Sequence, residues 1–442
     1  MVIKQKHLVE FQIYYLLIVE AFIDLLHFPS IIRYALDANL ILLLILSLPK
    51  IKNIINDRFF KKYNLYVIVY MGALIIFSLL RQTKIGLVFW AVRNNFFYIF
   101  FFFICAYTFK PKDVYRILGN VEKLNIFNVL CVLYEYFILG YYGDNIGGML
   151  GTDYGCNGYL NMYLVIVTAY VIIKYINKKT SILNVLWISL SSMAIAVVSE
   201  IKFYFIEFVI IIILSVSLSR LSYKNGFVVL SAVMAVFVGF QLLTAIDTNS
   251  ADLLKDFDKM TSYASATYEN AVISRARPFS QINDTFFNHK LFYNLFGFGF
   301  GACESSETFA WANTSFATKY GKTHYRSLST AVNFLETGYI GLIAFIMIFV
   351  LFFIVVQKHK HLTPEHRYIM VFSQLSSLLA IINIWYNASI RRPIAYLTFF
   401  CMSGAVIMLC DKQRQELKEL KEKEQTLKGK KTYFKQKKKY IR

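Results

Sequence analysis

Long apolar runs recur along the chain, and short polar stretches separate them. A helix needs about 20 apolar residues to span the hydrocarbon core of a bilayer. Twelve runs are of roughly this length, so the pattern predicts an all-α, polytopic membrane bundle of about 12 transmembrane helices. The predicted helices are Leu8–Phe28, Tyr34–Leu48, Leu65–Leu80, Phe89–Phe109, Leu118–Leu139, Tyr159–Ile176, Ile182–Val198, Phe203–Leu218, Phe227–Ala245, Leu328–Val356, Tyr368–Tyr386 and Ile394–Cys410.

The basic residues are distributed as membrane orientation requires. With a cytoplasmic N-terminus, 32 of the 47 lysines and arginines fall in the inner loops and the tail. An even number of crossings then places both termini in the cytoplasm. This distribution also accounts for the net charge of +20, so we expect no nucleic-acid binding.

Composition supports a membrane protein without a bound metal. Hydrophobic residues make up 57% of the chain and charged residues 17%, against about 25% in soluble proteins. The six cysteines show no metal-ligand spacing, and we expect no cofactor. Only Cys156 and Cys303 fall in predicted outer loops. A disulfide between them is one possibility, but we favour free thiols.

One long hydrophilic insertion divides the predicted helices. We assign helices one to nine to residues 1–246, an outer loop to 247–326, helices ten to twelve to 327–410, and a basic cytoplasmic tail to 411–442. The loop carries eight basic and eight acidic residues, and a loop of this length is usually functional. Within it, Asp252–Tyr268 and Ser280–Phe287 have the pattern of short surface helices.

The tail has widely spaced leucines among glutamates and lysines. It predicts a solvated helix followed by a basic run, Lys435–Lys439. We expect part of this segment to be disordered and to bind anionic lipid headgroups. This role is favoured over recruitment of a cytoplasmic partner.

Several cations on the predicted outer side are not needed for membrane orientation. Guanidinium groups form bidentate pairs with phosphate oxygens, so as a set these residues predict a pyrophosphate site. The alternative for each is an ion pair with an acid such as Asp37, Glu200 or Asp284. The candidate ligands are Arg93, Lys202, Arg275, Arg277 and Arg326.

The outer loop contains two further features. A stretch of alternating Gly and Phe, Leu295–Gly301, lets the backbone approach another chain or a ligand closely. His324 then stands directly before the tenth predicted helix, at the expected membrane surface. Glu336 lies two to three turns further along that helix.

In this order, the features resemble the O-antigen ligase and Wzy-type polymerase superfamily of bacterial envelope proteins. The Gly-rich outer loop that begins at Gly147 and the late position of the long loop match the same pattern. The motifs that carry the resemblance are Ser274–Arg277, Leu295–Gly301, His324, and Glu336 with Gly338 and Gly341.

The resemblance implies a GT-C-type glycosyltransferase fold and metal-independent glycan transfer on the outer face of the bacterial cytoplasmic membrane. The implied donor is an undecaprenyl-pyrophosphate-linked oligosaccharide, and the acceptor is a sugar hydroxyl of a lipid-linked chain. Membrane lipids and a chain-length regulator protein are the implied partners. His324 is the candidate base, with Glu336 as its orienter or as the alternative base. The five outer cations would bind the departing pyrophosphate.

Three other functions stay open beside repeat-unit polymerisation. One is an O-antigen ligase-type transfer of finished glycan to another acceptor. Another is a flippase for lipid-linked oligosaccharide, which needs a charged path through the bundle. The third is a scaffold or sensor whose tail recruits a partner. The unassigned charge is concentrated on one side of the membrane, which favours an enzyme working at that face.

Overall fold

The computed structural model describes residues 4–50, 57–219, 223–246, 258–259, 262, 273–306 and 308–440. Every regular element within these ranges is helical, and each of the twelve predicted segments is a helix. Eight helices in the described ranges are long and apolar enough to cross a membrane. The multi-pass helical character is therefore confirmed, whereas twelve crossings remain a prediction.

The bundle helices follow the apolar runs closely. In chain order they are α1 (Gln5–Asp24), α2 (Ala35–Ser47), α4 (Lys61–Leu80), α5 (Ile85–Thr108), α6 (Pro111–Phe137), α7 (Asn157–Ile176), α8 (Ile182–Val198), α9 (Lys202–Leu218), α10 (Tyr223–Ile246), α16 (Ser329–His359), α17 (Arg367–Tyr386) and α18 (Ala395–Tyr440).

Two predicted helix ends are wrong, and local chemistry explains both. α6 begins seven residues earlier than predicted, at Pro111, which is favoured at a first helical position. The Asp113 carboxylate also accepts a hydrogen bond from the Lys110 backbone N–H at 3.0 Å. α1 ends at Asp24 rather than Phe28 because His27 adopts a positive φ of 55°.

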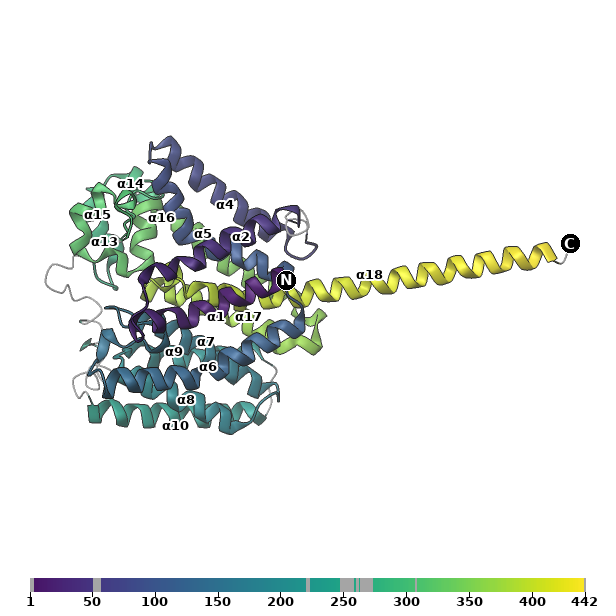
Figure 1. Ribbon diagram of the computed structural model, residues 1–442, viewed down its shortest axis with the longest axis horizontal. Coiled ribbons are helices and arrows are strands. Elements are labelled where there is room, and N and C mark those ends of the chain that lie inside the picture. The colour runs from purple at the N-terminus through teal and green to yellow at the C-terminus, as the bar shows by residue number, and fades with distance from the viewer. Residues whose placement is uncertain are drawn as a thin grey trace.

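The helices lie side by side and leave two distinct ends to the bundle (Figure 1). The N-terminus and the extension of α18 lie at one end, here called the tail end. The short helices α13 (Pro278–Ile282), α14 (Leu291–Phe296) and α15 (Ser315–Tyr320) lie at the other, here called the loop end. This shared position of the N-terminus and the tail matches an even number of passes.

The predicted surface helix at Ser280–Phe287 is confirmed as α13 followed by a π-helical turn, Asn283–Phe287. The other predicted loop helix, Asp252–Tyr268, falls almost entirely outside the described residues. The predicted tail helix is present as a continuation of α18, which runs to Tyr440.

α16 is broken at Gly338, where the outer loop packs against it. Gly338 has φ 62° and ψ −166°, a conformation that is essentially restricted to glycine. At the break, Phe298 N–H donates to the Leu335 carbonyl at 2.8 Å, and Gly299 N–H donates to the Glu336 carbonyl at 2.9 Å. The loop therefore supplies donors to the last carbonyls before the break.

This contact is possible only because both surfaces lack side chains. A Cβ at Gly297 would collide with the backbone of Glu336 and Thr337, and a Cβ at Gly338 would collide with that of Leu295 and Phe296. The close approach predicted from the Gly/Phe stretch is confirmed, and its partner is α16 of the same chain.

Replacing Gly338 by Ala should lower the stability of the protein. The substitution combines an unfavourable backbone conformation, worth about 1–3 kcal/mol, with a collision against the loop backbone. Thermal unfolding in detergent should show a clear drop in midpoint. Gly72→Ala in α4 is the matched control, because a Cβ there meets no atom within 4 Å. Equal midpoints for the two variants would contradict this role of the break.

Candidate functional site

A buried ion pair joins the outer loop to the bundle at the loop end. Arg391 belongs to the short turn Ser389–Arg391 between α17 and α18. Its guanidinium Nη2 contacts Oε1 of Glu304, which lies just beyond the Gly/Phe stretch. The two side chains are only 9% and 5% exposed. The pair therefore connects segments that are far apart in sequence.

Two asparagines of α5 complete the hydrogen bonding of this pair. Arg391 Nε donates to Asn95 Oδ1 at 3.1 Å, and Asn94 Nδ2 donates to the second Glu304 oxygen at 2.8 Å. Burying two charges is favourable only when such additional hydrogen bonds offset the loss of water. The site thus combines the outer loop, α5 and the turn before α18.

A second buried acid, Glu336, interacts electrostatically with Arg391. Burial alone would lower the pKa of Arg391, but the carboxylates of Glu304 and Glu336 outweigh it and raise that pKa. Glu336 is 1% exposed, and its Oε2 has no hydrogen-bond partner within the described ranges. Ionisable groups buried in a membrane bundle are expensive, so they mark candidate functional sites.

Glu336 is connected to the His324 turn through two intermediates. Its Oε1 accepts a hydrogen bond from Cys303 N–H at 3.0 Å, and the Cys303 carbonyl accepts one from the Tyr325 hydroxyl at 2.6 Å. Tyr325 is buried, whereas its neighbour His324 is exposed and has a positive φ of 53°. In the described part of the chain no hydrogen bond joins His324 to Glu336, so any orientation is indirect.

Arg326 lies on the other side of Tyr325 and contacts the same loop segment. Its guanidinium donates to the Ser305 hydroxyl, and the Ser305 carbonyl accepts a hydrogen bond from Trp90 Nε1 at 3.3 Å. Consecutive residues, Glu304 and Ser305, therefore hold Arg391 and Arg326. Burial raises the pKa of the Tyr325 hydroxyl, which keeps this donor protonated.

Arg93 forms an ion pair with Asp37, which is the alternative to pyrophosphate binding that the sequence left open. Its Nη2 and Nε donate to Asp37 Oδ2 at 2.8 and 3.1 Å, and its Nη1 donates to Asn94 Oδ1 at 2.9 Å. Through Asn94 it also reaches Glu304. Arg93 therefore contributes positive charge near the buried pair, although an acid already holds its guanidinium.

Aromatic side chains surround this part of the loop end. The Trp90 ring lies 5.6 Å from each of Phe309 and Trp311, and the Arg93 guanidinium lies 5.0 Å from the Trp90 ring. Trp311 is 53% exposed. The group presents an apolar aromatic surface beside charged residues.

Arg275 contacts the last residue of α17, Tyr386, which also contacts the first turn of α9, where Lys202 lies. Arg275 Nε donates to the Tyr386 carbonyl at 3.2 Å, and its guanidinium lies 5.2 Å from the Tyr386 ring. The same ring stacks on Phe203, the neighbour of Lys202, at 4.3 Å. Lys202 Nζ lies 4.0 Å from Glu200, again as the ion-pair alternative predicts. The third acid of that alternative, Asp284, pairs with His289 rather than with an arginine.

The structure thus brings the predicted residues into two groups. Arg326 and Glu336 contact the segment Cys303–Ser305 directly, and Arg93 reaches it through Asn94. Arg275 contacts Tyr386, whose ring stacks on Phe203, the residue after Lys202. Arg277 and His324 are exposed.

Three residues of the network around the buried pair were missed in the sequence: Asn94, Asn95 and Glu304. Arg391 is one of the outer cations of the sequence, but it was not chosen as a candidate ligand. Asn94 and Asn95 give the clearest signal, because two adjacent amides interrupt an otherwise apolar helix directly after Arg93. Arg391 follows α17 in a short connection where orientation rules require no cation.

The described residues contain neither a cluster that could bind a metal ion nor a disulfide bond. No group of three or more His, Cys, Asp or Glu residues there is arranged to hold a metal ion. Cys156 and Cys303 are both free, buried thiols, and burial raises the pKa of each.

Comparisons with protein-family models and with curated proteins find no match to this chain.

Replacing Arg391 by Met should destabilise the protein by about 3–5 kcal/mol, because it leaves the Glu304 carboxylate buried and unpaired. Thermal unfolding in detergent measures the loss, and Glu304→Gln in the same chain should restore part of it. Arg392→Met is the matched control, since Arg392 is exposed. A similar small effect for both arginines would show that the buried pair is not structurally important.

Proposed function

We propose that this protein is a polysaccharide polymerase of the O-antigen or capsule type. In this proposal it is a metal-independent glycosyltransferase that joins lipid-linked repeat units on the outer face of a bacterial cytoplasmic membrane. The observation that carries the proposal is the buried network of Arg391, Glu304 and Glu336, which supports the exposed turn with His324. The sequence resemblance adds the substrate class.

The reaction needs little beyond positioning, a base and positive charge. The acceptor oxygen bonds to the anomeric carbon of the donor glycan while the bond from that carbon to the pyrophosphate oxygen breaks. The acceptor proton passes to the base, and undecaprenyl pyrophosphate leaves with the bonding electron pair. A fixed base and preorganised cations stabilise this transition state.

We assign the base to His324 because its imidazole is exposed and histidine is the side chain that most often acts as a general base. Glu336 is assigned a positioning role, since it holds Cys303, which in turn holds Tyr325 beside His324. Direct proton abstraction by Glu336 is the alternative. It requires the acceptor to reach a carboxylate that is 1% exposed.

The pyrophosphate site is assigned to the outer cations. Arg275 and Arg326 each donate to a protein oxygen, and a guanidinium has five N–H donors, so further donors can reach phosphate oxygens. Arg277 is exposed and adjoins Arg275. Arg93 and Lys202 already pair with acids, which offset most of their positive charge, so we assign them a smaller share of the pyrophosphate binding. The exposed Trp311 ring offers a face against which a sugar ring can pack.

The loop end is assigned to the outer face from the charge distribution. The N-terminus, the short loops at the tail end and the tail together carry 32 of the 47 lysines and arginines, as cytoplasmic segments do. The donor lipid would then present its pyrophosphate to the loop end from the surrounding bilayer.

Replacing His324 by Ala should stop chain elongation. Purified protein is incubated with a lipid-linked repeat unit, and product length is read on a gel. Loss of a general base should slow the reaction by about 100-fold or more. His289→Ala is the matched control, because His289 is also an exposed loop histidine with a positive φ, 57°.

The product pattern of the unaltered protein separates the functions. A ladder of products indicates a polymerase, and a single transfer product indicates a ligase. Failure to form any product from an intact donor would argue against both enzymes and favour a flippase.

Two substitutions of Glu336 separate its two roles. Glu336→Gln keeps an oxygen that can accept from Cys303 N–H, so a positioning role predicts retention of most activity. Glu336→Ala removes this acceptor and should lower kcat about 10-fold or more, as expected when a supporting hydrogen bond is lost. If Glu336 is the base, Glu336→Gln must be as inactive as Glu336→Ala.

A further inference from the structure

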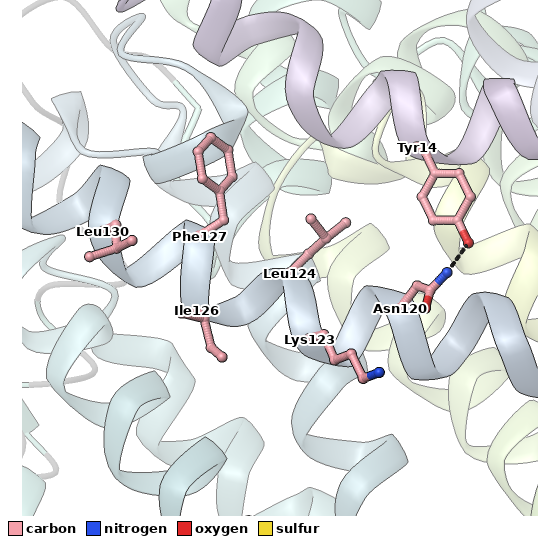
Figure 2. Close-up of a pocket in the computed structure, with 7 residues that line it drawn as sticks. All are labelled: Tyr14, Asn120, Lys123, Leu124, Ile126, Phe127 and Leu130. Carbon is pink, nitrogen blue, oxygen red and sulfur yellow. Dashed lines mark hydrogen bonds between the residues drawn. The ribbon is translucent and has the colours of Figure 1, made fainter.

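A groove lies on the side of the bundle between α1 and α6, apart from the loop-end site. It has a volume of about 500 Å³ and is lined by Tyr14 of α1 and by six residues of α6 between Asn120 and Leu130 (Figure 2). Its lining changes from polar to apolar along α6. A molecule with a polar head and an apolar chain would match this change from polar to apolar lining.

The polar part contains three side chains with hydrogen-bond donors. Asn120 Nδ2 donates to the Tyr14 hydroxyl oxygen at 2.8 Å, so the hydroxyl proton can be donated to another acceptor. Lys123 is exposed, and its amine extends toward the Asn120 end of the groove (Figure 2). Within the described residues Lys123 forms no ion pair. The adjacent acid, Glu122, is bound to Lys174 at 2.6 Å.

The apolar part continues along the same helix. Leu124, Phe127 and Leu130 recur every three residues, and Figure 2 shows them following one another away from Lys123. Phe127 is 41% exposed, Leu130 58% and Ile126 56%. Exposed apolar side chains on a membrane-spanning helix are expected to contact lipid.

Lys123 lies level with the ends of neighbouring helices. It follows Pro111 by twelve residues, or about 18 Å along the helix. Its neighbour Glu122 binds Lys174 in the last turn of α7, and accepts a hydrogen bond from Asn184 in the first turn of α8 at 2.6 Å. Lys123 therefore lies near the connection between α7 and α8, where the headgroups of the surrounding lipids are expected.

We propose that the groove binds one anionic glycerophospholipid. Its phosphate contacts the Lys123 ammonium and the Tyr14 hydroxyl, and one acyl chain lies along Leu124, Phe127 and Leu130. The site supplies the negative charge that Lys123 lacks. The proposal does not depend on the proposed enzymatic function, and it is separate from the basic run in the tail.

Lipid titration of the purified full-length protein in detergent, followed by native mass spectrometry, tests the proposal. Phosphatidylglycerol should occupy the first tight site about five-fold more strongly than phosphatidylcholine, which is the scale of one lysine near an anionic headgroup. Lys123→Gln should abolish this preference. Lys112→Gln should retain it, because Lys112 is an exposed lysine in the first turn of the same helix.

A second measurement separates loss of binding from loss of folding. Phosphatidylglycerol should raise the unfolding temperature of the unaltered protein and of Lys112→Gln more than phosphatidylcholine does, because a ligand of the native state stabilises it. Lys123→Gln should unfold normally in phosphatidylcholine but gain no extra increase from phosphatidylglycerol. Tyr14→Phe should reduce the increase.

Two results would overturn the proposal. One is equal affinity of the unaltered protein for both lipids. The other is a phosphatidylglycerol preference in Lys123→Gln that matches that of Lys112→Gln, which would assign the preference to the tail or to another basic surface.

Discussion

Two backbone hydrogen bonds, from Phe298 and Gly299 to the carbonyls of Leu335 and Glu336, determine how the loop end is built. A membrane helix can break only where other groups satisfy the backbone that the break leaves unpaired. The break at Gly338 therefore requires the outer loop, and the loop requires glycines to come close enough. Because the break directly follows this turn, the Glu336 side chain also faces the loop and accepts from Cys303.

The buried charges depend on this contact. Once the loop is held against α16, Glu304 reaches Arg391 and Asn94, and Ser305 reaches Arg326. Buried ion pairs rarely add net stability, because desolvation consumes most of the attraction. The network is better understood as a device that fixes the geometry of the turn carrying His324.

The helices could be predicted from the sequence because an apolar run is a local property. The close approach of the Gly/Phe stretch was also predictable, since glycine permits it wherever the partner lies. Its partner was not predictable, because Gly297 and Gly338 are about 40 residues apart. The buried ion pair of Arg391 was not predictable for the same reason, because its partner Glu304 lies 87 residues earlier in the chain. The indirect link between Glu336 and the His324 turn was not predictable either, because it depends on the left-handed backbone of His324 and on the short 3₁₀ turns on either side of it.

The local ion pairs show where residue chemistry alone was sufficient. Arg93 and Asp37, and Lys202 and Glu200, form the pairs that proximity of opposite charge suggests. Arg275 differs, because it binds a carbonyl and an aromatic ring rather than an acid. Within the described ranges no acid pairs with the Arg275 guanidinium.

The unbroken course of α18 has a mechanical consequence. The helix starts four residues after Arg391 and runs for 46 residues, or about 70 Å, to Tyr440. An α-helix without a kink resists bending, so its two ends cannot reorient independently. Any tilt imposed on its first turn by a change around Arg391 would therefore move the far end of the helix, beyond the tail end of the bundle, through a larger arc (Figure 1).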